Sequence, residues 1–349
     1  MRSRIEKLLS NVEDDRAVFI SGYPNIFYYS GFTSEDAWLI ISKTEQMLIT
    51  DSRYTVQAKE QAPDFDIIDI EKGWDKIFAG VKEEKICFEE NAVTFGFFEK
   101  LQKKAENKRF YKAQKAIDAP RRIKDKSELK IIAEAEHIGD MAFSHMLEFM
   151  RAGMTEREIA LELETFMKKQ GASDLSFQTI AASGVRSAMP HGVASDKVVK
   201  KGELLTLDFG CVYKGYCSDM TRTVVFGEPD EKQKEIYGIV LKAQTEALDK
   251  IHEGIKCSDA DKIARDVIND TGYGENFGHS LGHSVGIEIH EMPCFSPKSK
   301  DILKNGNVLS VEPGIYIDGW GGVRIEDLIA VIDGKIVNFA SSPKNLIVI

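Results

Sequence analysis

The stretch KGELLTLDFGCVYKG, residues 201–215, returns in altered form as NGNVLSVEPGIYIDG, residues 305–319. Three glycines and one leucine of the two stretches coincide when they are aligned at a constant offset. Asp208 of the first stretch then falls on Glu312 of the second. A repeated unit, in which an apolar strand runs into a hairpin, is the simplest explanation. Each copy would end its strand with a carboxylate at the same place.

Strand alternation predicts that these carboxylates come in pairs. In the first copy, Asp208 lies on the more polar face, and a two-residue hairpin loop would bring Asp219 onto the same face, diagonal to it. In the second copy, an odd-length loop centred on Gly319 would set Glu312 directly opposite Glu326. A β-bulge in either hairpin would break this parity.

Four carboxylates on inward strand faces need compensation, because burying like charges together is costly or forces protonation. They could be solvated or salt-bridged on an exposed face of a sheet. The occurrence of a pair in each copy favours a different explanation, a site for two divalent cations that would neutralise the four groups.

Candidate imidazole ligands lie in HSLGHSVGIEIHE, residues 279–291. The glycines and the alternating apolar residues argue against a helix and predict a loop that runs into a strand. His283 sits between two glycines, which allow the backbone to approach closely. In the predicted strand, His290 would share a face with Gly286 and Glu288. No phosphate-binding glycine motif is present.

The composition is that of a globular protein with two domains: 349 residues, of which 43% are hydrophobic and 29% charged. A formal net charge of −10 disfavours a general nucleic-acid binder, which usually carries a basic face. No apolar run approaches the ~18 residues of a membrane span, and the N-terminus has no secretion-signal pattern. The five cysteines are scattered and include no CxxC motif, so we expect reduced thiols in a cytoplasmic protein.

Two regions differ in their secondary-structure patterns. Residues 1–120 alternate strand and helix patterns, which predicts an α/β domain. Residues 121–349 begin with long helical patterns and continue with strands, which predicts an α+β domain whose helices cover a sheet. Asp125 or Ser127 could cap the first long helix, and Thr155 opens a capping-box pattern for the second.

At this point the residues resemble those of the metallopeptidases with the pita-bread fold, family M24. The resemblance rests on the family's five-ligand dinuclear metal site, matched here by Asp208, Asp219, His283 in GHSVG, Glu312 in SVEPGIY and Glu326 in VRIED. The stretch ASGVRSAMPHG, which contains His191, is similar to another signature of that family. Upstream, SGYPNIFYYSGF and ITDSRYTVQAKEQA resemble the N-terminal domain found in aminopeptidase P and prolidase.

The resemblance implies a creatinase- and prolidase-like α/β domain over residues 1–120 and a pita-bread catalytic domain over residues 121–349. It implies an Xaa-Pro aminopeptidase (aminopeptidase P), which cleaves the bond between an N-terminal residue and a following proline by attack of a metal-bridging hydroxide. Two divalent metal ions are expected, Mn²⁺ first and Co²⁺ or Zn²⁺ as alternatives, since carboxylates with one imidazole suit Mn²⁺. It also implies a cytoplasmic homodimer that takes proline-containing peptides, with no nucleic-acid or membrane partner.

The matched positions imply the metal-binding roles. Asp219 and His283 would each hold one metal, or nearly so. Asp208 and Glu326 would bridge both metals. Glu312 would bind metal and also act as the general base.

Other polar residues would act on the substrate or on the ligands. His290 would donate a hydrogen bond to the oxyanion of the tetrahedral intermediate. His279 and His191 would line the pocket for the proline-containing part of the substrate. Arg324 would orient the carboxylates, and a surface salt bridge is the alternative for it.

The main alternative activity is that of an Xaa-Pro dipeptidase (prolidase), which must read a free carboxylate beside proline. Some prolidases carry an arginine shortly after the HE of the last histidine motif, where HEMPC places Cys294. That departure favours aminopeptidase P. Methionine aminopeptidase usually lacks the N-terminal domain, and a metal-free pita-bread binding protein would not be expected to keep all five ligands.

Overall fold

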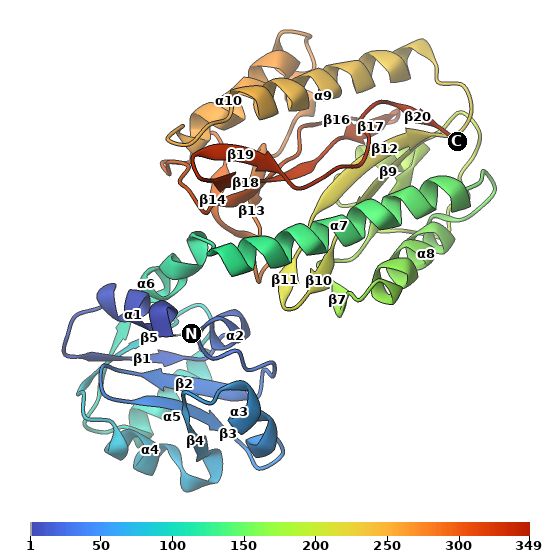
Figure 1. Cartoon of the computed structure of the whole chain (residues 1–349). Coiled ribbons are helices and arrows are strands. Elements are labelled where there is room, and N and C mark those ends of the chain that lie inside the picture. Colours follow the sequence, from blue (N-terminus) through green and yellow to red (C-terminus); the bar gives the residue numbers. More distant parts are fainter. Residues whose placement is uncertain (1) are drawn as a thin grey trace. The chain divides into compact units, whose positions relative to one another are not determined.

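The computed structural model describes Arg2–Ile349. The chain divides into two compact units, Met1–Arg121 and Arg122–Ile349 (Figure 1). Within the part of the chain that the structure describes, no helix has both the length and the apolar character needed to cross a membrane.

The first unit is an α/β domain, as predicted. Its strands are β1 (Arg16–Ile20), β2 (Ala37–Ile41), β3 (Gln46–Thr50), β4 (Asp66–Asp69), β5 (Lys85–Phe88) and β6 (Arg109–Lys112). Its helices are α1 (Arg2–Ser10), α2 (Tyr23–Ser30), α3 (Thr55–Gln61), η1 (Ile70–Lys72), α4 (Trp74–Gly80), α5 (Phe95–Lys104) and α6 (Gln114–Asp118), and η2 (Ala119–Arg122) follows. The strands form one mixed sheet in the order β4-β3-β2-β1-β5-β6. Phe19 and Trp38 pack edge to face against Trp74 in its core.

The second unit combines long helices with several short sheets. Its helices are α7 (Lys126–Phe149), α8 (Glu156–Lys169), η3 (Gly184–Ala188), α9 (Glu231–Lys250), α10 (Cys257–Asn269) and η4 (Gly274–Asn276). The strands of its first half are β7 (Asp174–Leu175), β8 (Ile180–Ser183), β9 (Leu204–Phe209), β10 (Cys211–Tyr213), β11 (Tyr216–Cys217) and β12 (Met220–Val225). The strands of its second half are β13 (Gly282–Ser284), β14 (Glu291–Phe295), β15 (Val308–Val311), β16 (Gly314–Ile317), β17 (Gly321–Arg324), β18 (Asp327–Ile332), β19 (Lys335–Asn338) and β20 (Ile347–Val348).

Helices cover the strands of this unit from two sides (Figure 1). The sheets run in the orders β20-β12-β9-β8 and β14-β13-β15-β18-β19. Helices α7 and α8 pack on the first through a core that includes Phe143, Leu207 and Phe209. Helices α9 and α10 pack on the second through a core that includes Tyr237 and Leu309. Burial of these two apolar faces fixes the sheets between the helix pairs.

The two long helices that begin this unit start where the sequence predicts. Asp125, rather than Ser127, caps α7, and its carboxylate accepts a hydrogen bond from the Glu128 N–H at 3.0 Å. Thr155 caps α8 in the same way, with the hydroxyl accepting from the Glu158 N–H at 3.1 Å. Both are capping boxes, in which the glutamate bonds back to the N-cap backbone.

The first repeat forms a hairpin in the predicted register. Asp208 on β9 pairs with Thr221 on β12. Between them, β10 and β11 are joined by a two-residue loop, in which Lys214 has φ 48° and Gly215 has φ 82°. Positive φ at both positions is what a type I′ turn requires. Asp219 therefore lies diagonal to Asp208.

The second repeat also keeps its predicted register. The β15–β18 ladder ends at the pair of Val311 with Asp327, and the β16–β17 ladder continues in the same register. Glu312 and Glu326 occupy the gap between the two ladders, and that register sets them opposite each other. The connecting loop is centred on Gly319, as the odd-length prediction requires.

The segment between β13 and β14 contradicts one prediction. Gly286, Glu288 and His290 do not share a strand face, because residues 285–290 form a bend. The Glu291 carboxylate accepts hydrogen bonds from two backbone N–H groups of the bend, and the Gly286 N–H donates to the Glu288 carbonyl at 3.0 Å. The Cys217 N–H of β11 also donates to the Gly286 carbonyl, at 2.7 Å. These contacts hold the bend without a regular ladder, so His290 projects from a turn.

Substitution of Gly210 by alanine should destabilise the first hairpin. A Cβ at this position would lie 2.0 Å from the Ser218 carbonyl oxygen, a backbone atom that cannot move without disrupting the hairpin. Overpacking of this kind costs about 1–3 kcal/mol or more, so the melting temperature should fall by several degrees. The control is Gly238→Ala on the exposed side of α9, where a Cβ meets nothing within 4 Å and helix propensity improves. Equal melting temperatures for the two variants would contradict the close approach at Gly210.

Candidate metal centre

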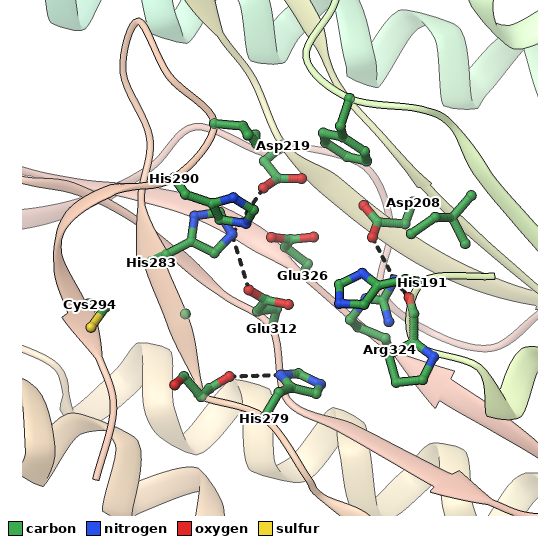
Figure 2. Close-up of a pocket in the computed structure, with 16 residues that line it drawn as sticks. His191, Asp208, Asp219, His279, His283, His290, Cys294, Glu312, Arg324 and Glu326 are labelled. Carbon is green, nitrogen blue, oxygen red and sulfur yellow. Dashed lines mark hydrogen bonds and ion pairs between the residues drawn. The ribbon is translucent and has the colours of Figure 1, made fainter. Parts of the chain in front are cut away.

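One cavity of about 400 Å³ in the second unit gathers the polar residues that the sequence singled out (Figure 2). It is lined by the predicted metal ligands and the predicted catalytic residues, together with a few apolar side chains. The predicted residues are Asp208, Asp219, His283, Glu312 and Glu326, with His191, His279, His290 and Arg324. The apolar lining comes from Phe177, Ile180, Pro190 and Ile289.

The carboxylates converge because the two repeats lie side by side. Glu326 links them: its carboxylate accepts from the Thr221 hydroxyl at 2.7 Å, and its N–H donates to the Thr221 carbonyl at 3.1 Å. One ligand atom from each of Asp219, His283 and Glu326 lies within 4.8 Å of the other two. These three residues could hold a cation, and Glu312 projects toward the same point from below in the view of Figure 2.

Crowding and burial disfavour full ionisation of these acids. Burial first, and then the charges of Glu326 and Asp208, raise the pKa of Asp219 well above its usual value. Burial and the neighbouring carboxylates raise the pKa of Glu326 in the same direction. Burial also raises the pKa of Glu312 to about 8. The acids therefore need either protons or cations.

His283 presents a lone pair to this cluster. Its Nδ1 lies 3.3 Å from the Ser284 carbonyl, which can only accept, so the ring proton of the neutral form is assigned to Nδ1. Its Nε2 then lies unprotonated 3.5 Å from Asp219 Oδ2 and 3.4 Å from Glu312 Oε1. Burial, and then the neighbouring His290, lower the pKa of His283 to about 4, so the ring is neutral near pH 7. A lone pair and two carboxylate oxygens facing one point are a donor set for a cation.

Two carboxylate oxygens support the same conclusion. Asp208 Oδ1 and Glu326 Oε1 are buried and have no hydrogen-bond partner among residues 2–349. Unpaired buried acceptors are expensive unless an ion or water completes them. The residues thus fit divalent cations bound by oxygen and one imidazole, which is the donor set that Mn²⁺ accepts well. In Figure 2 the thiol of Cys294 lies apart from the carboxylates.

Arg324 is a buried partner of the cluster and not a surface residue. Its side chain is 4% exposed, and its Nη2 donates to Asp208 Oδ2 at 2.5 Å. Nη1 donates to the Tyr316 hydroxyl at 2.6 Å, and Nη2 also donates to the Pro190 carbonyl at 3.2 Å. The guanidinium therefore restrains the Asp208 carboxylate, and its role in orienting the metal ligands stays a prediction.

His279 lines the cavity but is tied to the protein by both nitrogens. Nδ1 lies 2.8 Å from the Ser280 carbonyl and Nε2 lies 2.9 Å from the Tyr316 hydroxyl. Burial lowers the pKa of His279 to about 4, so it remains neutral and accepts from Tyr316. Neither Tyr316 nor Thr221 was recognised in the sequence, because both contact the cluster only across separate strands and nothing in the spacing marks them.

The two remaining histidines lie on opposite sides of the cavity (Figure 2). The ring of His290 packs against that of His283, with centroids 4.3 Å apart. His191 lies beside Asp208 and Arg324 in the same view. Both side chains are exposed, so both can reach a molecule bound in the cavity.

The metal-free protein should lose stability as the pH rises above 7. The pKa of Glu312 is about 8 in the folded state, against about 4.3 when unfolded, so the folded state binds more protons between those values. The stabilisation that protonation provides is present at low pH and is lost as the pH rises through 8. The lowered pKa of His279 and of His283 acts in the opposite direction, but only below about pH 6.5, the unfolded value.

Thermal unfolding of chelator-treated protein at pH 7.0 and at 8.5 should therefore show a lower melting temperature at the higher pH. One titrating group contributes at most about 1.4 kcal/mol per pH unit. Glu312→Gln should reduce the fall, and added Mn²⁺ should raise the melting temperature more at pH 8.5 than at pH 7.0. If the melting temperature of the Glu312→Gln variant falls between pH 7.0 and pH 8.5 as much as that of wild type, Glu312 does not carry this proton.

Known proteins of this architecture are similar over their whole length. An Xaa-Pro dipeptidase of Pyrococcus horikoshii is 40% identical over 353 residues, which cover 99% of each chain. Among solved structures, an Xaa-Pro dipeptidase from Bacillus anthracis has a TM-score of 0.96 at 43% identity, covering 100% of this chain and 99% of the other. An X-Pro aminopeptidase from Thermotoga maritima has a TM-score of 0.93 at 39% identity, covering 99% and 100%.

Family profiles match both parts of the chain. The profile of the creatinase/prolidase N-terminal domain matches residues 3–123, and that of metallopeptidase family M24 matches residues 130–333. The latter range contains every residue of the acidic cavity. The chain therefore belongs to metallopeptidase family M24, with a creatinase/prolidase N-terminal domain ahead of a pita-bread catalytic domain.

Proposed function

We propose that this metallopeptidase is an Xaa-Pro dipeptidase, which releases proline from dipeptides. The observation that carries the proposal is a cavity of about 400 Å³ lined by four carboxylates, two of which face the lone pair of His283. Xaa-Pro as the substrate class, and a dipeptide as its length, are supported by the names of similar proteins from Pyrococcus horikoshii and Bacillus anthracis.

As a member of its family, the protein uses divalent metal, and we propose two ions, Mn²⁺ first and Co²⁺ or Zn²⁺ as alternatives. The residues that would hold them are Asp208, Asp219, His283, Glu312 and Glu326. When bound, the metals supply Lewis acidity to the scissile carbonyl and to the attacking water. The unpaired buried oxygens of Asp208 and Glu326 support direct coordination by both residues.

The side chains around the cluster have separate tasks. Glu312 would take a proton from the attacking water and return it to the departing proline nitrogen, which leaves poorly as an anion. His290 would donate to the carbonyl oxygen as negative charge develops there. Arg324 would hold Asp208 in place.

The substrate would bind on the side of the cavity where His191 lies. This residue, with Phe177 and Ile180, would contact the proline-containing part of the dipeptide. His279 is assigned a different task from the one expected for it. Because both of its nitrogens bond to the protein, we infer that it holds Tyr316 against Arg324 and does not contact the substrate.

The expected preference for aminopeptidase P is not the one that the relatives support. It rested on Cys294, which stands where some prolidases carry an arginine. Two of the proteins reported above, similar at 40% and 43% identity, are named Xaa-Pro dipeptidases. Aminopeptidase P remains the second candidate, because the Thermotoga maritima protein, at 39% identity, is named an X-Pro aminopeptidase. The homodimer and the cytoplasmic location stay predictions.

The deciding experiment compares Xaa-Pro and Xaa-Pro-Yaa peptides on enzyme stripped with chelator and reloaded with Mn²⁺. We expect Mn²⁺-dependent release of proline from the dipeptide and much slower cleavage of the tripeptide. Preference for the tripeptide would make the protein an aminopeptidase P. Absence of cleavage of either peptide would overturn the proposed activity and bring back methionine aminopeptidase or a binding role.

Substitution of His283 by alanine should remove a metal ligand and with it the activity. Loss of a residue that coordinates the metal directly should reduce both the bound metal and kcat/KM by at least about 100-fold when metal is limiting. His252→Ala is the matched control, because that histidine is exposed and bonds to the neighbouring Glu253 carbonyl. Metal content by elemental analysis and turnover of the dipeptide measure the two effects. A His283→Ala enzyme with full activity and full metal content would contradict the assignment.

A further inference from the structure

A buried carboxylate outside the cavity is tied to the loop that carries His191. Glu156 is the first residue of α8, and it is 0% exposed. An acid at this position commonly interacts with the N-terminus of its own helix. Here Thr155 and Glu158 already cap α8 through their capping box. The Glu156 side chain is thus left to make other hydrogen bonds.

Two serines that donate hydrogen bonds to its carboxylate flank one loop, residues 184–194. Oε1 accepts from the Ser183 N–H and hydroxyl, both at 2.8 Å, at the end of β8. Oε2 accepts from the Ser195 N–H at 3.1 Å and hydroxyl at 2.6 Å, just after the loop. One carboxylate therefore holds the entry and the exit of the loop together.

The loop is also fixed from within. Arg186 forms an ion pair with Glu156 Oε2 and donates to the Val193 carbonyl at 3.0 Å. Near its middle, the Ser187 hydroxyl accepts from the Gly322 N–H of β17 at 2.8 Å. With a guanidinium, two hydroxyls and two N–H groups around it, the buried Glu156 carboxylate is well compensated.

The loop delivers two groups to the cavity. Pro190 and His191 both line it, and the Pro190 carbonyl accepts from Arg324, which in turn bonds to Asp208. The imidazole of His191 has no hydrogen bond among those found within residues 2–349, whereas its carbonyl accepts from the Val193 N–H at 2.9 Å. The position of its ring therefore depends on the loop backbone.

We propose that Glu156 is a positioning residue of the enzyme, which acts on substrate binding through His191 by holding the 184–194 loop closed at its base. The proposal rests on the proposed function, because it assumes that His191 contacts the substrate. Glu156 itself contacts neither the substrate nor the metal ligands.

Glu156→Gln tests this with little change of shape. The amide replaces one acceptor oxygen by a donor, which would face either the Ser183 donors or the Ser195 and Arg186 donors. We expect kcat/KM for an Xaa-Pro dipeptide to fall by about 10–100-fold, mostly through KM, with unchanged metal content. Hydrogen exchange of the amides in residues 183–195 should be faster than in wild type, and this readout does not require activity.

A double-mutant cycle with His191→Ala identifies the route of the effect. If Glu156 acts through His191, Glu156→Gln should raise KM little or not at all in a His191→Ala background. A general loss of stability would instead lower activity by the same factor in both backgrounds. Additive effects would therefore overturn the proposal.

Asp140→Asn is the matched control for removal of a buried carboxylate. Asp140 accepts from the N–H and hydroxyl groups of Ser341 and Ser342, at 2.6–3.1 Å, but that segment contributes no residue to the cavity. The Asp140→Asn variant should have a lower melting temperature than wild type and the same KM.

Unchanged hydrogen exchange or an unchanged KM in the Glu156→Gln variant would overturn the proposal. If the wild-type protein cleaves no Xaa-Pro peptide, the proposed function is wrong. The hydrogen-exchange experiment still tests whether Glu156 holds the 184–194 loop.

Discussion

Mutual repulsion among four carboxylates in one cavity is the constraint on which the rest of this structure depends. One ligand atom of Asp219 lies within 4.8 Å of one of Glu326, and at that distance two negative charges repel by several kcal/mol even at an intermediate dielectric. Protons can relieve this repulsion, and burial with the neighbouring charges raises the pKa of Asp219, Glu312 and Glu326 in that direction. Divalent cations relieve it better, since they also satisfy the oxygens that have no hydrogen-bond donor.

The fold holds the carboxylates close together with strands and buried hydrogen bonds. Each hairpin of the repeat contributes one pair of acids, and Thr221 joins the hairpins by bonding to Glu326. Arg324 pairs with Asp208 as a compensating cation, and it donates to the Tyr316 hydroxyl, which also bonds to His279. The loop that carries His191 is held in turn by Glu156. The groups that bind metal are thus fixed by strands, whereas the group assigned to the substrate is fixed by a loop with one buried anchor.

The sequence was sufficient for the features that follow from local periodicity. The capping box at Thr155, the hairpin registers and the pairing of Glu312 with Glu326 all follow from spacing and turn chemistry, and the structure has them as predicted. Spacing alone left the cap of α7 open between Asp125 and Ser127. The sequence was not sufficient where contacts join distant segments. The bend at residues 285–290 depends on the Glu291 carboxylate, which alternation alone cannot reveal, and the contacts of Tyr316 and Glu156 depend on tertiary packing. The position Cys294 favoured aminopeptidase P, whereas two similar proteins are named Xaa-Pro dipeptidases, and a single position could not indicate this.

Counting bound metal tests the central claim most directly. Chelator-treated protein would be dialysed against excess Mn²⁺, freed of loose ions on a desalting column, and measured by elemental analysis against protein concentration. The account predicts two ions per chain, and fewer than one in a variant with Asp219→Asn and Glu326→Gln together. Wild-type protein that retains no divalent metal, or a double variant that retains as much as wild type, would contradict the claim that these carboxylates exist to bind cations.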